Sequence, residues 1–160
     1  MAKILLLEEQ FTETSEPDRI EQALLDMGHD VFSFATYNNL RTAWRVDSSQ
    51  PREQGGCVLQ DVDVVVASVY MPGKDAIHIP ALRHNPAFDD AFAKTPIIAY
   101  ELGDLWSAER VKALGADQFV QVCGAETFET AVIPLVRQHV PDVPGRTGSL
   151  TIYNPMRAPG

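Results

Sequence analysis

The fold is decided by the stretch VDVVVASV, residues 62–69. A dense apolar run of this length, rich in β-branched residues, is typical of a strand that is buried on both faces of a parallel sheet. Shorter runs of the same kind occupy residues 4–7, 31–35, 96–100 and 118–122. Helical patterns separate them, over residues 15–27, 38–44, 76–83, 107–114 and 127–140. This alternation predicts an α/β fold, a doubly wound five-stranded parallel sheet with helices on both faces.

The pattern predicts one domain over residues 1–140. Within it, residues 46–61 are polar and contain Pro51 and a Gly55–Gly56 pair, which predicts a long exposed loop. Ser15 and Asn38–Asn39 are the expected helix caps, and Pro134 should bend the last helix. Residues 141–160 are rich in Pro and Gly and are expected to form a tail that is flexible or docks on another surface, and only residues 150–153 have a strand pattern.

Composition excludes several classes of function. The 160 residues contain 22 acidic and 13 basic side chains, a net charge of -9, which argues against binding to nucleic acid or to an anionic membrane. No apolar run is long enough to span a membrane and no signal peptide is evident, so we expect a cytoplasmic protein. Cys57 and Cys123 lie in no metal-binding motif, and glycine-rich phosphate loops are absent from the sequence. We therefore expect neither a metal nor a cofactor.

Ligand sites of doubly wound sheets lie outside the carboxyl ends of the strands. The residues at these positions are Glu8, Glu9, Ser68, Tyr70, Glu101 and Val122. Crowded carboxylates at such a crevice would raise a pKa or recruit a cation. The histidines suggest no ligand set, because His78 and His84 do not share a helix face and are expected at the surface.

Four blocks, in order, resemble response-regulator receiver domains, whose flavodoxin-like sheet has the predicted architecture. They are KILLLEE (residues 3–9), DVVVASVYMPG (63–73), TPIIAYE (95–101) and LGADQF (114–119). The resemblance covers about residues 3–140 and implies a role in bacterial two-component signal transduction. Relative to the family pattern, the loop at residues 46–61 is expanded.

The family's phosphorylation chemistry is not retained at the matching positions. Glu8 and Glu9 match the acidic pair that helps to hold Mg²⁺, but Ser68 stands where the family has its phosphoacceptor aspartate. Glu101 replaces the family's Thr or Ser, and Val122 replaces its Lys. A serine cannot form an acyl phosphate, and a valine offers no positive charge to a phosphoryl group. The resemblance is therefore to a degenerate receiver that is not phosphorylated in the family's manner.

Three interpretations of the acidic crevice stay open at this point. The carboxylates could form a solvated rim left from an abandoned site, they could bind a cation weakly, or Glu101 could imitate the signalling-on state permanently. Catalysis by Ser68 is not expected, because no histidine lies in a recognisable partner motif. We therefore expect a protein that is not an enzyme.

The resulting hypothesis is a phosphorylation-independent module for protein–protein interaction, with a protein partner or a second copy of the chain. Receiver-like domains contact their partners through the face of the fourth helix, fifth strand and fifth helix, which here would include Leu105, Trp106, Arg110, Phe119 and residues of the last helix. Trp106 is either an interface anchor or a ring that covers the core edge. One alternative is a flavodoxin-like domain that binds a small ligand. The other is a structural domain, because LEEQF (residues 7–11) loosely resembles the amino-terminal wing of bacterial basic amino-acid decarboxylases.

Overall fold

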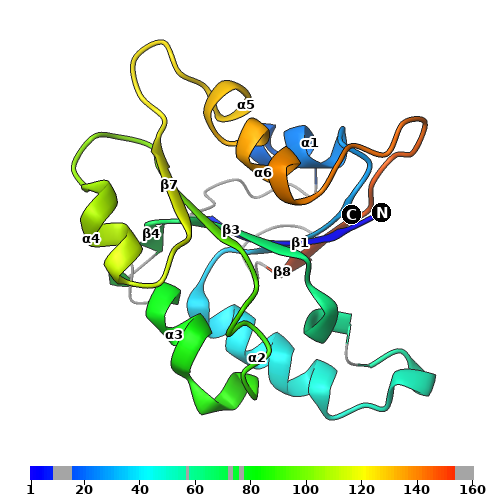
Figure 1. Cartoon of the computed structure of the whole chain (residues 1–160). Helices are drawn as coiled ribbons and strands as arrows, with labels where there is room; N and C mark the ends of the chain where they lie inside the picture. Colours follow the sequence, from blue (N-terminus) through cyan, green and yellow to red (C-terminus); the bar gives the residue numbers. More distant parts are fainter. Residues whose placement is uncertain (9–15, 57, 72–73, 76–77, 154–160) are drawn as a thin grey trace.

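The computed structural model describes residues 1–8, 16–56, 58–71, 74–75 and 78–153 (Figure 1). Its centre is a parallel sheet in the order β7-β6-β3-β1-β2-β8. The strands are β1 (Lys3–Leu7), β2 (Asp30–Phe34), β3 (Val64–Ser68), β6 (Ile97–Glu101), β7 (Gln118–Gln121) and β8 (Leu150–Tyr153). Two short strands, β4 (Tyr70–Met71) and β5 (Lys74–Asp75), pair separately. The predicted α/β fold with a parallel sheet is confirmed, but the sheet has six strands and not five.

Helices cover both faces of this sheet (Figure 1). They are α1 (Arg19–Leu25), α2 (Tyr37–Ser48), α3 (His78–His84), α4 (Ala108–Ala113), α5 (Phe128–Ala131) and α6 (Ile133–His139). One face packs against α1, α5 and α6, and the other against α2, α3 and α4. The break between α5 and α6 falls at Val132, two residues before Pro134, where the sequence predicts a bend.

Two helix starts differ from the sequence prediction. Asp18, not Ser15, caps α1: its carboxylate accepts from the Glu21 amide at 2.8 Å, and Glu21 accepts from the Asp18 amide at 2.9 Å. Thr36, not Asn38, caps α2, because its hydroxyl accepts from the Asn39 amide at 3.0 Å. A cap must lie in extended backbone immediately before the first turn, and a run of several polar residues does not identify which of them does so.

The loop predicted over residues 46–61 is shorter in the structure, because part of this segment is helical. Its first residues complete α2, and two 3₁₀ helices follow, η1 (Arg52–Gln54) and η2 (Val58–Asp61). The carboxylate of Asp47 accepts from the amides of Val58 and Leu59 at 2.9 and 3.0 Å. Leu59 is buried in the core, so this end of the segment is anchored and not freely exposed.

Of the two expectations for the tail, flexibility is wrong for residues 150–153, which dock on the sheet. Leu150–Tyr153 forms β8 and pairs in parallel with β2 at the edge of the sheet (Figure 1). The Tyr153 ring stacks on Phe34 at 4.3 Å between centroids. The side-chain amide of Asn39 donates to the Tyr153 carbonyl at 2.7 Å. Residues 154–160 lie outside the described part of the chain. Among the described residues, no helix is long and apolar enough to cross a membrane.

Candidate functional site

The carboxyl ends of the central strands bring the predicted site residues to one edge of the sheet. Glu8 follows β1, Ser68 ends β3, Glu101 ends β6, and Val122 follows β7. Ser68 pairs in register with Tyr100, so Glu101 lies one step beyond it on the neighbouring strand. The Val122 amide donates to the Glu101 carbonyl at 2.7 Å. Glu9 lies outside the described residues.

Glu101 is fully buried, and its carboxylate accepts hydrogen bonds from four groups. Oε2 accepts from the Tyr70 hydroxyl at 2.7 Å and from the Leu105 amide at 2.9 Å. Oε1 accepts from the Trp106 amide at 3.0 Å and from the Gln121 side chain at 3.2 Å. These bonds fix the loop at residues 102–106, which connects β6 to α4, to the end of the sheet.

These hydrogen bonds also decide the protonation state of Glu101. Burial raises the pKa of the Glu101 carboxyl, but its four donors together outweigh burial and hold that pKa below its ordinary value. The sequence-based expectation that crowding with other acids would raise a pKa at this crevice is therefore wrong for Glu101. Its ionised form is stabilised by donors that belong to the fold.

Glu8 converges with a different set of acids. The Glu8 residue is 3% exposed, and one oxygen of its carboxylate lies within 4.8 Å of one oxygen of Asp18 and one of Glu21, which are equally close to each other. Asp18 and Glu21 already serve as the reciprocal cap of α1. Burial raises the pKa of the nearby Tyr100 hydroxyl well above its usual value, and the charges of these three acids raise it further. Because Glu8 and Glu101 are both buried, they do not form the solvated acidic rim that was one interpretation of the sequence.

Ser68 and His78 are buried beside each other. The Ser68 hydroxyl oxygen accepts from the Tyr70 amide at 3.1 Å, so it stabilises the turn after β3. Nε2 of His78 lies 2.7 Å from the Ser68 carbonyl oxygen, while Nδ1 is buried without a hydrogen-bond partner among the described residues. The prediction of a surface His78 is wrong: the ring is fully buried and burial lowers its pKa to about 4, although His84 is exposed as expected. A neutral His78 that contacts a carbonyl is not arranged to activate the Ser68 hydroxyl.

The predicted interaction face divides into exposed and packed residues. Leu105 is 79% exposed, and Leu102, which the sequence analysis did not single out, is 60% exposed. Trp106 and Phe119 are half-buried and pack against the core. The Arg110 guanidinium lies 4.0 Å from the centroid of the Trp106 ring. Trp106 thus covers the core edge, and the two leucines are the solvent-facing apolar groups of this loop.

Sequence reasoning missed the donors that surround Glu101. Tyr70 was noted only as a strand-end residue, and nothing in the sequence indicated that Gln121 reaches Glu101 and the Trp106 carbonyl, the latter at 2.9 Å. The register of parallel strands provides a partial signal, because Glu101 pairs with Gln121 once β6 and β7 are adjacent. The identity of the remaining donors depends on loop geometry, which has no sequence periodicity.

No protein-family model matches the chain, and no curated protein matches it either. Solved structures do match. The chemotaxis protein CheY4 of Vibrio cholerae is 18% identical with a TM-score of 0.57, over 88% of this chain and 99% of that one. The receiver domain of the histidine kinase CKI1 of Arabidopsis thaliana, solved with Mg²⁺, is 20% identical with a TM-score of 0.58, over 86% of this chain and 90% of that one. The BeF3-activated DrrB receiver domain is 16% identical with a TM-score of 0.50, over 88% and 97%. The chain therefore has a receiver-like fold.

Proposed function

We propose that the protein is a degenerate receiver-like domain that works in signal transduction through protein contact, without phosphorylation and without catalysis. The observation that carries this proposal is the four-donor environment of the Glu101 carboxylate. The Glu101 carboxylate supplies a permanent negative charge at the end of β6. At the matching position, receiver domains have the hydroxyl of a Thr or Ser. The loop at residues 102–106 thus has a fixed anionic anchor that needs no phosphoryl group.

The replacement of groups that phosphoryl transfer requires supports the same proposal. Phosphoryl transfer to a receiver requires a carboxylate nucleophile, a bound Mg²⁺ and a positive charge near the phosphoryl group. Ser68 lacks the carboxylate, and its hydroxyl oxygen is engaged by the Tyr70 amide. Val122 carries no charge, and the buried anion of Glu101 would repel an incoming phosphate.

The exposed leucines support a role in protein contact. Leu102 and Leu105 project from a loop whose backbone is held by Glu101, so binding would cost little ordering entropy. The partner in this proposal is a cytoplasmic signalling or assembly protein. A second copy of the chain is the other candidate, and sedimentation of the purified protein over a range of concentrations distinguishes the two.

The first test addresses phosphorylation. The purified protein is incubated with Mg²⁺ and acetyl phosphate, and its intact mass is read under conditions that preserve acyl phosphates. We expect no added phosphate. A stable phosphate adduct would overturn the proposal, because another carboxylate would then have replaced the missing acceptor.

The second test addresses protein contact. Wild type and the double variant Leu102→Ser/Leu105→Ser are used as baits in extracts of the source cells. Val46→Ser is the matched control, because Val46 is 56% exposed but lies on α2. We expect a specific protein to bind wild type and the control and to be lost from the double variant. Equal binding to all three baits would exclude this face.

A further inference from the structure

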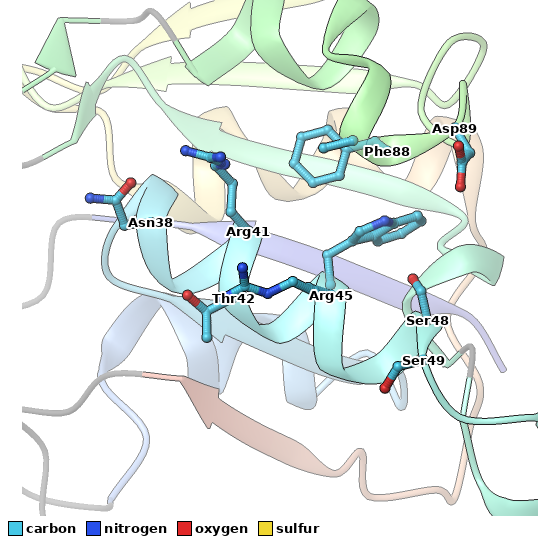
Figure 2. A pocket seen from close by; sticks show the side chains of 10 residues that line it. Asn38, Arg41, Thr42, Arg45, Ser48, Ser49, Phe88 and Asp89 are labelled. Carbon is cyan, nitrogen blue, oxygen red and sulfur yellow. The ribbon is translucent and has the colours of Figure 1, made fainter.

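A cavity of about 530 Å³ lies between α2 and η3 (Pro86–Phe88), away from the strand ends that carry Ser68 and Glu101. Figure 2 shows the residues that line it. Arg41 and Arg45 come from α2, together with smaller polar side chains of that helix, and Phe88 and Asp89 come from the opposite wall. The rings of Trp44 and Phe88 meet edge to face at 5.4 Å beneath it, but they belong to the core and are only 3% and 0% exposed. This volume is within the range of small-molecule sites.

The arginines in the described part of the chain fall into two groups. Five arginines there form ion pairs with carboxylates: Arg19, Arg52, Arg83, Arg137 and Arg146. The other three do not: Arg110 lies over the Trp106 ring, and Arg41 lies over the Tyr37 ring at 5.9 Å from its centroid. Among the described residues, Arg41 and Arg45 have no carboxylate within salt-bridge distance, although the chain carries a net charge of -9. Because they lie one helical turn apart, both guanidiniums reach the same cavity.

The opposite wall is built from strained backbone. Asp89 and Asp90 have φ angles of 49° and 58°, in the left-handed region that side chains other than glycine rarely adopt. Hydrogen bonds from the Asp89 amide to Pro86 and from the Ala91 amide to Phe88 hold this turn. Such conformations persist where the surrounding structure fixes them, and they are concentrated at ligand sites. Here the turn places Asp89 at the end of the cavity opposite Arg41 (Figure 2).

We propose that this cavity binds a small organic acid that carries a hydrogen-bond donor at its far end. The acid group pairs with the guanidiniums of Arg41 and Arg45. The donor, a hydroxyl or an amine, reaches the Asp89 carboxylate. A large polyanion does not fit these features, because the overall negative charge repels it and Asp89 closes one end.

The test uses 4-hydroxybenzoate as the probe and its methyl ester as the uncharged match. Each is titrated into the ¹⁵N-labelled protein, and amide shifts of α2 and residues 86–91 are followed. We expect saturable shifts with the acid and at least tenfold weaker binding of the ester, since one charge-assisted hydrogen bond contributes about that factor. Equal affinities for acid and ester, or no shift with tens of millimolar acid, would overturn the proposal.

Variants then assign the binding energy to residues. Arg41→Gln/Arg45→Gln should bind the acid at least tenfold more weakly, whereas Arg137→Gln, an exposed arginine on α6, should bind it as wild type does. Both guanidiniums are exposed, so the spectrum of the double variant should keep its dispersion. Unchanged affinity of a folded double variant would show that any binding is apolar and would refute the site. An affinity loss of the same size in Arg137→Gln would show a general charge effect and would also refute it.

Discussion

The hydroxyl of Tyr70 donates a 2.7 Å hydrogen bond to Oε2 of Glu101 and joins the loop after β3 to the loop after β6. The same carboxylate accepts from the Leu105 and Trp106 amides, so one buried anion organises both loops at this end of the sheet. Because the charge belongs to a side chain and not to a transferable group, the arrangement is a constant feature of the folded state.

The first prediction concerns the removal of this charge. Glu101→Gln keeps the shape of the side chain but presents an NH₂ group to donors, so two hydrogen bonds are lost and those that remain lose their charge assistance. We expect the free energy of unfolding to fall by about 2 kcal/mol, measured by urea denaturation. Glu53→Gln, an exposed glutamate of η1, is the control and should change it by less than about 0.5 kcal/mol.

The pH dependence of this effect has a definite sign. The pKa of Glu101 is lower in the folded protein than in the unfolded chain, so its stabilising contribution is complete above the unfolded pKa and is lost as pH falls through the folded pKa. The difference in stability between wild type and Glu101→Gln should therefore shrink under acidic conditions. A difference that stays constant down to the acid transition would contradict the ionised state assigned to Glu101.

The second prediction uses His78. Burial lowers the pKa of His78 from 6.5 to about 4, so the unfolded chain binds a proton between these values and the folded protein does not. Stability linked to His78 is therefore complete above pH 6.5 and falls as pH decreases toward 4. Between pH 7 and pH 5 the loss should be about 2 kcal/mol, and it should be absent in His78→Gln.

His84 provides the control for this experiment. It lies on the same helix but is exposed, so His84→Gln should retain the full pH dependence of wild type. The relevant quantity is the difference between urea unfolding energies at the two pH values, not the absolute stability, because His78→Gln also changes core packing. An identical pH dependence in wild type and His78→Gln would show that His78 titrates normally.

Periodic features of the sequence predicted the main architecture. The run at residues 62–69 contains β3, which lies inside the sheet, and the alternation of strands and helices correctly predicted that the sheet is parallel. Hydrophobic periodicity predicts the architecture because it reports which residues are buried, and every strand of the sheet has buried residues. Burial alone, however, did not distinguish the polar residues inside from those outside: His78 is buried and His84 is exposed.

The parts that the sequence did not predict depend on contacts between distant residues. The carboxylate of Asp30 accepts from the Ser149 amide and from the Arg146 guanidinium, across more than one hundred residues, and so positions β8 beside β2. Within residues 141–160 a short strand pattern is visible, but the partner that orders it is not. The four donors of Glu101 are of the same kind, since they come from three separate loops and strands.

The third prediction tests the attachment of β8. Tyr153→Ala removes a half-buried ring that is stacked on Phe34, and we expect it to lower the free energy of unfolding by about 2 kcal/mol. Thr151→Ala is the control, because Thr151 lies on the same strand with an exposed side chain. If both variants unfold at the same urea concentration as wild type, β8 contributes nothing to the stability of the sheet.

The fourth prediction concerns Arg83, whose side chain is 10% exposed and joins α3 to the segments before β6 and β7. Its guanidinium donates to the carbonyls of Phe92, Thr95 and Gly115, at 2.7, 2.7 and 3.1 Å. It also pairs with Asp117 at 2.7 Å. Gly115 has a φ of +120°, which side chains rarely adopt. A Cβ at this position would also lie 3.1 Å from Arg83 Cγ, because the backbone passes close to the arginine side chain.

Removal of this side chain leaves three carbonyls without their donor. We expect Arg83→Ala to lower the free energy of unfolding by about 3 kcal/mol in urea. Arg83→Lys should recover less than half of that loss, since an ammonium cannot reproduce the planar fork of the guanidinium. Arg137→Ala is the matched control: its ion pair with Asp142 is exposed, and its loss should cost less than about 1 kcal/mol. Equal effects of Arg83→Ala and Arg137→Ala would mean that Arg83 acts as a surface ion pair, and full recovery by lysine would mean that only its charge is needed.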